Sequence, residues 1–411
     1  MIEPAARSPI ESRLAAAGLP PLPRTAWLEV DLDALRGNLA VLRGLAGPGV
    51  PVRPVVKADA YGHGAVPVAS ALEAAGADGF CVATFDEAIE LRTGGVRGSI
   101  LALYPIPAAW VGDAARQRIM VTAGDPAGLG DMVRAAAVDP TRPLSIELEV
   151  ETGLGRGGFD TEALVTAARL VAVSPRTVLA GVWTHLQAAD DEALTAIQVD
   201  RFESAAAAIA AAGIGLPPRH IAASAGLLAD HVLAYEGVRP GLAIYGLLPD
   251  ELAGVAPAGV AAALRPAMAL LARPVRVADL PAGQGISYGP TFRTTRPSRI
   301  ATLPIGYADG WSRRLSNRAS ALVRGQRVPL VGNVAMDAVM ADVTDVPGRP
   351  VDATDEFVLL GASGDERITA AELAQERTTI SWEVVTTMSR RLPRVYHAAA
   401  GPVGLRTLTE P

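Results

Sequence analysis

VVKADAYGHG, residues 55–64, joins a short apolar run to a glycine-rich turn, with a lysine at the junction. The apolar residues before Lys57 predict a buried strand, and the glycines at 62 and 64 predict that the chain turns soon after it. A lysine where a buried strand ends is costly, because its ammonium group is strongly hydrated. The segments around it must therefore explain why it is there.

Short apolar runs alternate with alanine-rich helical stretches from about residue 52 onward. This alternation predicts a parallel sheet covered by helices, and eight repeats fit a (β/α)8 barrel of the TIM type. The competing arrangement is an open doubly wound sheet, but no G-x-G-x-x-G follows the first run to support it. The expected strands are residues 54–57, 80–83, 100–103, 119–122, 145–150, 179–184, 221–224 and 242–245.

The character of the sequence changes after residue 265, where Val, Thr, Arg and Pro rise and helical patterns fade. This composition predicts a second, mostly β domain with helices near residues 370–376 and 382–390. The segment TAWLEVD, residues 25–31, is expected to be a strand that joins this domain. The predicted division is a flexible leader (1–24), a barrel (25–265), a β domain (266–400) and a tail (401–411).

The bulk composition narrows the possible functions. A chain of 411 residues has room for two domains, and its net charge of −6 is spread along the chain, which argues against nucleic-acid binding. The single cysteine, Cys81, allows no intrachain disulfide and favours a reducing compartment. Neither a signal peptide nor an apolar run of about 18 residues is found, so we expect a cytoplasmic protein without a membrane span.

The position of Lys57 has two explanations. The C-terminal ends of the strands form the working face of a parallel barrel, so Lys57 would point into that mouth. There its amine could form a Schiff base with an aldehyde cofactor, whose phosphate would use N–H and hydroxyl donors at neighbouring strand ends. Alternatively, Lys57 extends to the rim and pairs with Asp59.

Further motifs favour the first explanation. VVKADAYGHG resembles the pyridoxal-phosphate signature of the alanine racemase family, and other segments resemble that family in its own order. The resemblance implies a pyridoxal 5'-phosphate enzyme of fold type III, a homodimer that interconverts L- and D-alanine and supplies D-alanine for peptidoglycan. The segments are ETGLGRGGF (151–159), THL (184–186), ASAG (223–226), VRPGLAIYGL (238–247), ISYGP (286–290), LPIGYADGW (303–311), VAMD (334–337) and RLPR (391–394).

The resemblance implies a two-base mechanism. Lys57 would hold the cofactor and act as the base on one face of the substrate α-carbon. Tyr288 of the second subunit would be the base on the opposite face. Two bases on opposite faces suit a racemase, because a proton leaves one face and returns to the other.

The same resemblance implies a set of binding residues and no metal. Arg239 would face the pyridine nitrogen and, being permanently protonated, keep that nitrogen unprotonated. His185 would lie against the ring, and the phosphate would be bound by Tyr61, Ser224, Gly241 and Leu242, with Trp382 as a further cofactor contact. The substrate side would be formed by Arg156, Met336, Asp337 and Tyr307, the last of which would line the access channel.

Several positions depart from the family pattern. Many relatives have a lysine, converted to a carbamate, where this chain has Glu149, so we expect Glu149 to pair with Arg156 directly and activity to need no carbon dioxide. Trp382 stands where a tyrosine is usual, and an indole donates one hydrogen bond and accepts none. The remaining departures are Glu151, Ala223, Asn333 and Ala335.

Three alternatives to an alanine racemase remain open. The altered pocket wall at Trp382 permits a racemase for another amino acid, such as serine. A decarboxylase of the same fold type is disfavoured, because such relatives place a cysteine near the cofactor in the β domain, whereas Ala335 stands there and Cys81 lies in the barrel. A cofactor carrier without turnover would lack the β-domain motifs that surround Tyr288.

Overall fold

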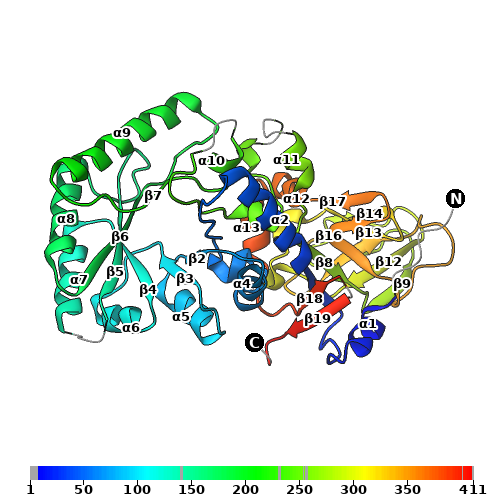
Figure 1. Cartoon of the computed structure of the whole chain (residues 1–411). Coiled ribbons are helices and arrows are strands. Elements are labelled where there is room, and N and C mark those ends of the chain that lie inside the picture. Colours follow the sequence, from blue (N-terminus) through cyan, green and yellow to red (C-terminus); the bar gives the residue numbers. More distant parts are fainter. Residues whose placement is uncertain are drawn as a thin grey trace. The chain divides into compact units, whose positions relative to one another are not determined.

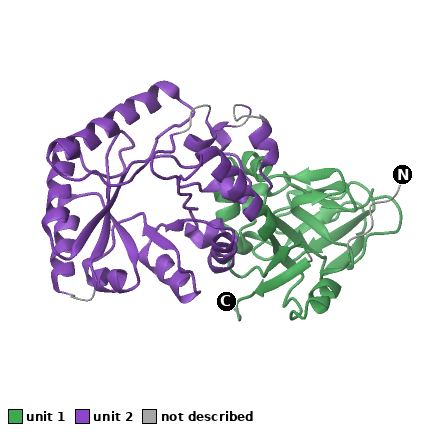
Figure 2. Cartoon of the chain, in the orientation of Figure 1, with its two compact units in different colours: residues 1–34, 266–411 green, residues 35–265 purple. Residues whose placement is uncertain are grey.

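The computed structural model describes residues 8–138, 142–229, 233–252, 254, 258–399 and 401–409 (Figure 1). The chain forms two compact units (Figure 2). One unit joins Met1–Ala34 to Pro266–Pro411, and the other is Leu35–Arg265. Among the described residues, no helix combines the length and the apolar character needed to cross a membrane.

The Leu35–Arg265 unit is built around a six-stranded parallel sheet in the order β2-β3-β4-β5-β6-β7. The sheet strands are β2 (Gly79–Val82), β3 (Ser99–Ala102), β4 (Ile119–Ala123), β5 (Leu144–Glu149), β6 (Thr177–Trp183) and β7 (Arg219–His220). The principal helices are α2 (Leu32–Ala46), α4 (Ala65–Ala74), α5 (Phe85–Thr93), α6 (Val111–Arg116), α7 (Pro126–Val138), α8 (Thr161–Val173), α9 (Glu192–Ala211), α10 (Ser224–Leu228) and α11 (Ala258–Ala263).

Two irregular segments complete the barrel. Val55 forms a parallel bridge with Cys81 of β2, and Val52 forms one with Val238. The amide of Arg239 donates to the carbonyl of Ala222, just after β7, at 2.9 Å. Eight parallel segments therefore follow one another around the ring, and the predicted fold class, a TIM-like barrel followed by a mostly β domain, is confirmed.

The eighth strand was predicted at the wrong place. Residues 242–245 form a 3-10 helix, η2 (Leu242–Tyr245), and Val238 occupies the eighth position of the ring. The amides of Gly241 and Ala243 donate to the Ser224 hydroxyl and not to a neighbouring strand, so this segment cannot continue the sheet. All four residues of η2 are buried, which explains why they looked like a core strand.

The other unit contains an 11-stranded sheet in the order β19-β18-β1-β8-β16-β13-β14-β15-β12-β9, with β17 paired to β16. Strand β1 pairs in parallel with β18 and antiparallel with β8, which confirms that the segment at 25–31 joins the β domain. Every other pairing in this sheet is antiparallel. Its strands are β1 (Ala26–Asp31), β8 (Met268–Ala272), β9 (Arg276–Leu280), β12 (Ser298–Leu303), β13 (Ser320–Val323), β14 (Gln326–Val331), β15 (Val339–Asp342), β16 (Phe357–Ser363), β17 (Glu366–Ile368), β18 (Arg394–Ala398) and β19 (Gly401–Arg406).

Short elements on this unit carry most of its predicted site residues. A two-stranded hairpin, β10 (Gly285–Ile286) and β11 (Phe292–Arg293), holds the SYG motif in its connecting loop. A 3-10 turn, η4 (Tyr307–Asp309), follows β12, and a second, η5 (Arg313–Leu315), comes soon after it. The helix expected near 370–376 is present as α12 (Ala370–Arg377), whereas α13 (Ser381–Thr386) ends earlier than the helix expected at 382–390.

The ends of the chain are more ordered than the sequence suggested. Within the expected flexible leader, α1 (Ile10–Ala16) is a helix whose Ile10 and Leu14, four residues apart on one face, are fully buried. Within the expected tail, residues 401–406 form β19, paired with β18. The parts of these two segments at residues 1–7 and 410–411 lie outside the described residues.

Candidate active site

Lys57 begins a short helical segment, α3 (Lys57–Tyr61), with an unusual backbone. Ala58, Asp59, Ala60 and Tyr61 all have φ between 52° and 57°, so four consecutive non-glycine residues adopt the left-handed helical conformation. This conformation costs roughly 1–2 kcal/mol per residue for L-amino acids. Backbone strain of this kind concentrates where function requires it, which points to this turn as part of a site.

Side-chain hydrogen bonds and ring stacking hold this turn in place. Glu87 Oε1 accepts a hydrogen bond from the Ala58 amide at 2.6 Å, and Asp59 Oδ1 accepts one from the Ala65 amide at 2.9 Å. The His63 ring stacks on Tyr245 with 4.4 Å between ring centroids. These contacts oppose the strain and fix the direction in which Lys57 leaves the strand.

The Lys57 amine lies in an environment that disfavours its charge. Burial lowers its pKa, and the nearby Arg156 guanidinium lowers it further. Glu87 acts in the opposite direction without reversing the shift. A lysine with a lowered pKa is a better nucleophile and a better proton acceptor near neutral pH.

Four of the predicted cofactor residues gather beside this turn. The Ser224 hydroxyl, at the start of α10, accepts hydrogen bonds from Gly241 N at 2.9 Å and Ala243 N at 3.1 Å. A Cβ atom added at Gly241 would lie only 2.7 Å from the Tyr61 hydroxyl, so the backbone and this hydroxyl are in close contact. Leu242 follows as the first residue of η2. The hydroxyls of Tyr61 and Ser224 therefore lie close to the start of η2.

Arg239 is buried under the ring of Trp183. Its guanidinium lies 4.8 Å from the Trp183 ring centroid and donates to the Thr184 carbonyl at 2.8 Å. It also donates to the His220 carbonyl at 3.0 Å and to His220 Nδ1. Burial lowers the pKa of Arg239 to about 10, so the side chain still carries its charge at neutral pH.

The hydrogen bonds of Arg239 continue through two more side chains. His220 Nε2 lies 2.7 Å from Glu147 Oε2, and Arg53 Nη1 donates to Glu147 Oε1 at 2.9 Å. Burial lowers the pKa of His220 to about 4, with Glu147 acting in the opposite direction. Burial alone would raise the pKa of Glu147, but His220 and Arg53 bring it down to about 2. His220 is therefore neutral: Nε2–H donates to Glu147, and Nδ1 accepts from Arg239.

Arg156 pairs with Glu149, as expected from the sequence. The two side chains form an ion pair at 3.2 Å, and Glu149 is 7% exposed. Burial raises the pKa of Glu149, while Arg156 opposes that shift. The loop that carries Arg156 is shaped by Glu151, whose carboxylate accepts from Gly155 N at 2.9 Å.

His185 follows β6 and shares the positive environment of the barrel mouth. Burial lowers its pKa to about 3, and Arg239, Arg156 and Lys57 all act in the same direction. The His185 ring is therefore neutral at physiological pH. Lys57, Arg156 and Arg239 therefore lie within electrostatic range of the His185 ring.

The remaining predicted residues lie on the other unit. Tyr288, Tyr307 and Met336 are exposed by 76%, 43% and 53%. Backbone bonds tie their segments together: Tyr307 N donates to the Ala335 carbonyl and Ala308 N to the Met336 carbonyl, both at 3.1 Å. Asn333 Nδ2 donates to the Tyr288 carbonyl at 2.8 Å.

Known proteins resemble this chain in both sequence and fold. The sequence-family model of the alanine racemase N-terminal domain matches residues 30–249, and the family model of the C-terminal domain matches residues 267–396. This chain belongs to the alanine racemase family.

Individual relatives align along nearly their whole length. The alanine racemase of Symbiobacterium thermophilum is 42% identical over 377 residues, covering 91% of this chain and 97% of that protein. That of Syntrophobacter fumaroxidans is 39% identical over 376 residues, covering 90% and 97%. The crystal structure of the Bacillus anthracis alanine racemase with bound L-Ala-P matches with a TM-score of 0.88, at 33% identity over 95% of this chain and 99% of that one. The E. faecalis alanine racemase structure matches with a TM-score of 0.84, at 35% identity over 91% and 98%.

Three residues of this alanine racemase family member were missed from the sequence, namely Arg53, Glu147 and His220. His220 was overlooked because the strand was expected at 221–224, whereas β7 is Arg219–His220. The chain has only five histidines; His220 ends β7 and His185 follows the neighbouring strand β6, which was the available signal. Nothing in the local sequence pairs Arg53 with Glu147, since they lie 94 residues apart.

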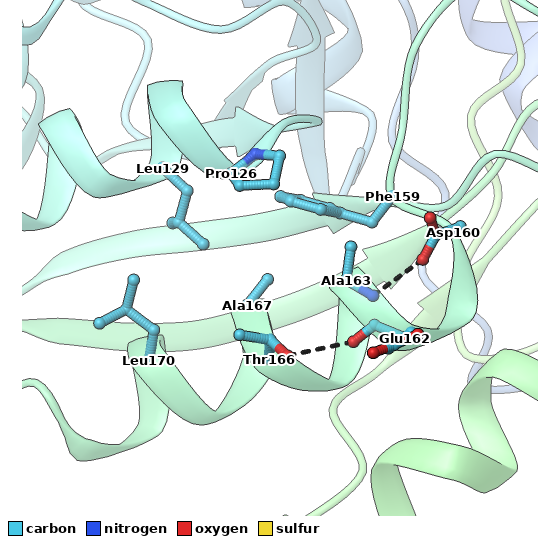
Figure 3. A pocket seen from close by; sticks show the side chains of 9 residues that line it. All are labelled: Pro126, Leu129, Phe159, Asp160, Glu162, Ala163, Thr166, Ala167 and Leu170. Atoms are coloured by element: carbon cyan, nitrogen blue, oxygen red, sulfur yellow. Dashed lines mark hydrogen bonds between the residues drawn. The ribbon is translucent and has the colours of Figure 1, made fainter.

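A groove on the barrel unit is lined by residues that do not belong to this site. It lies between α7 and α8 and is lined by Pro126, Leu129, Phe159, Asp160, Glu162, Ala163, Thr166, Ala167 and Leu170 (Figure 3). None of the predicted site residues is among them.

Proposed function

We propose that this protein is a pyridoxal-phosphate-dependent racemase that interconverts L- and D-alanine, with Lys57 and Tyr288 of the partner subunit as its two bases. The observation that supports the proposal is the strained turn at Lys57: its lysine has a lowered pKa and lies close to Arg156, and the same turn ends at Tyr61, whose hydroxyl lies against Gly241. The name shared by the curated relatives supports alanine as the substrate.

The residues of the barrel mouth fit pyridoxal phosphate. Lys57 would bind its aldehyde carbon covalently. Burial raises the pKa of Tyr61, so its hydroxyl stays protonated and can donate to a phosphate next to the Ser224 hydroxyl. Any side chain at Gly241 would collide with the Tyr61 hydroxyl, so a glycine keeps that hydroxyl beside the backbone. Leu242, His185 and Trp382 would complete the contacts.

When bound, the cofactor would draw electron density from the substrate α-carbon and make its proton acidic. Lys57 would take or return that proton on one face. Tyr288 would do so on the other, and its 76% exposure is consistent with a side chain that works outside its own fold unit. Neither residue needs a large motion, since each serves one face.

Arg239 would restrict the chemistry to proton transfer. Its guanidinium is charged at neutral pH despite full burial, because its pKa remains near 10. A cation at the pyridine nitrogen keeps that nitrogen from gaining a proton and makes the ring a weaker electron sink. His220 would hold Arg239 in place through its neutral Nδ1.

Arg156 would bind the substrate carboxylate, and Glu149 would orient Arg156. Glu149 supplies a buried negative charge at 3.2 Å without any covalent modification of the chain. The proposed activity is therefore independent of carbon dioxide. On the other unit, Met336 would offer its backbone N–H to the carboxylate, with Asp337 orienting that segment and Tyr307 lining the access channel.

We also propose a homodimer in which Tyr288 and Met336 of one subunit serve Lys57 of the other. The exposure of Tyr288, Tyr307 and Met336 supports an interface there, because exposed apolar clusters mark contact surfaces. The free, buried thiol of Cys81 supports a cytoplasmic location. Equilibrium sedimentation that finds a fully active monomer would contradict the shared site.

Exchange at the α-carbon tests the function directly. The purified holoenzyme is given L-alanine, L-serine and larger amino acids in deuterated water, and the products are resolved by chirality. Deuterated D-alanine as the main product is expected. Exchange only with another amino acid reassigns the substrate, loss of carbon dioxide indicates a decarboxylase, and bound cofactor without exchange refutes catalysis.

A further inference from the structure

The leader segment that precedes the first strand reaches into the β unit through one side chain. Arg24, at the end of the proline-bearing stretch PPLPR, donates to Asp309 Oδ1 at 2.6 Å and to Asp309 Oδ2 at 3.2 Å. It also donates to the Pro304 carbonyl. This is the bidentate geometry in which a guanidinium binds a carboxylate most strongly. Arg24 and Asp309 are 285 residues apart in the sequence.

Asp309 is the centre of a chain of alternating charges. Its side chain is fully buried, and it also pairs with Arg391 Nε at 2.8 Å. Arg391 uses a second nitrogen to bind Asp337. The order is therefore Arg24, Asp309, Arg391, Asp337, and the side-chain exposure rises from 0% at Asp309 to 34% at Arg391 and 58% at Asp337.

Asp309 also fixes the turn that carries Tyr307. Its Oδ2 accepts from the Gly306 amide at 3.0 Å, which closes η4. A Cβ atom added at Gly306 would lie 2.2 Å from the Ala335 carbonyl oxygen, so this turn lies directly against the 335–336 segment. One buried carboxylate thus sets the position of both segments that face the substrate in the proposed function.

Arg391 pairs with two carboxylates, those of Asp309 and Asp337, and Arg24 makes this possible by sharing Asp309. A buried carboxylate requires compensating charge and hydrogen bonds. With Arg24 in place, Asp309 is satisfied from one side, and Arg391 can keep one nitrogen on Asp337. Without Arg24, Arg391 would be drawn entirely to Asp309, and Asp337 with the neighbouring Met336 would lose its anchor.

We infer that Arg24 is a positioning residue for the reaction: through Asp309 and Arg391 it sets the geometry of the Tyr307 turn and of the Met336–Asp337 segment. The inference rests on the proposed function, because it assumes that these two segments meet the substrate. It gives the leader a role in the active site as well as in stability.

The test compares Arg24→Ala and Arg24→Lys with a control in the same leader. Arg13→Ala removes an arginine of similar burial, whose partner is Glu29 at 3.0 Å, away from the charge chain. For the holoenzyme, Arg24→Ala is expected to raise the KM for alanine about tenfold, in line with the loss of a charged hydrogen bond, with a smaller effect on kcat. Arg24→Lys and millimolar guanidinium should each restore part of the loss, and Arg13→Ala should lower Tm with KM unchanged.

Hydrogen–deuterium exchange gives a readout that does not depend on catalysis. The amides of Gly306, Tyr307 and Ala308 should exchange faster in Arg24→Ala than in the wild type or Arg13→Ala. Unchanged exchange at these amides overturns the inference, as does an equal rise in KM for both variants. If the wild type racemises nothing but the amides respond as expected, the proposed function fails while the positioning role stands.

Discussion

Glu147→Gln is the sharpest probe of the barrel interior. Glu147 is 1% exposed and holds Arg53 at 2.9 Å and His220 at 2.7 Å. The amide of glutamine carries no charge, so Arg53 loses its counter-ion. Its NH2 group would also face His220 Nε2, which would push the ring proton to Nδ1, the atom that accepts from Arg239.

The magnitude follows from the burial of the partners. Removing one member of a buried ion pair costs about 3–5 kcal/mol, which corresponds to a fall in Tm of about 10 °C for a unit of this size. Glu203→Gln is the matched control, because Glu203 also pairs with an arginine, Arg219 at 3.1 Å, but is 46% exposed. That pair should contribute less than about 1 kcal/mol.

Acid unfolding checks the same group independently. The folded pKa of Glu147 is about 2, below the ordinary value of 4.5, so its ionised form stabilises the fold. This contribution is complete above pH 4.5 and is lost as pH falls toward 2. Calorimetry of wild type and Glu147→Gln from neutral pH down to pH 3 should show a difference that shrinks with acid. Equal stability of Glu147→Gln and Glu203→Gln at neutral pH would refute the reasoning.

Three further predictions concern the site itself. Lys57→Ala should abolish the visible absorbance of the bound cofactor, whereas absorbance that survives would mean a different attachment point. Tyr288→Phe should keep that absorbance but lose α-proton exchange at one face only, and equal loss at both faces would count against two bases. Gly241→Ala should weaken cofactor binding, because its Cβ would lie 2.7 Å from the Tyr61 hydroxyl. Unchanged affinity for pyridoxal phosphate in a titration would contradict that last expectation.

The features that could be predicted from the sequence are those that depend on a local pattern of residues. The alternation of apolar runs and helical stretches led to a barrel, because parallel strands need helical crossovers and this spacing repeats. The eighth segment was misplaced, since a buried 3-10 helix such as η2 has the same apolar composition as a buried strand. The Glu149–Arg156 pair was found because both residues flank one short motif loop.

Features that depend on distant contacts were not predictable. The pairing of Arg53, Glu147 and His220 joins three barrel segments, and the contact of Arg24 with Asp309 spans 285 residues. Periodicity reports which face a side chain occupies but not which partner it meets. The order of α1 was missed for the same reason, because this helix contacts β19 near the other end of the chain.

The left-handed turn explains why a lysine stands where the first barrel segment ends. A right-handed helix starting at Lys57 would send Tyr61 elsewhere, whereas four residues with φ near 55° bring the Tyr61 hydroxyl against Gly241. The strain, roughly 1–2 kcal/mol per residue, is opposed by Glu87, Asp59 and the stacked His63 ring. No glycine occupies residues 58–61, so the chain relies on these contacts and not on backbone freedom. One local conformation thereby joins the proposed covalent anchor, Lys57, to the proposed phosphate contact, Tyr61.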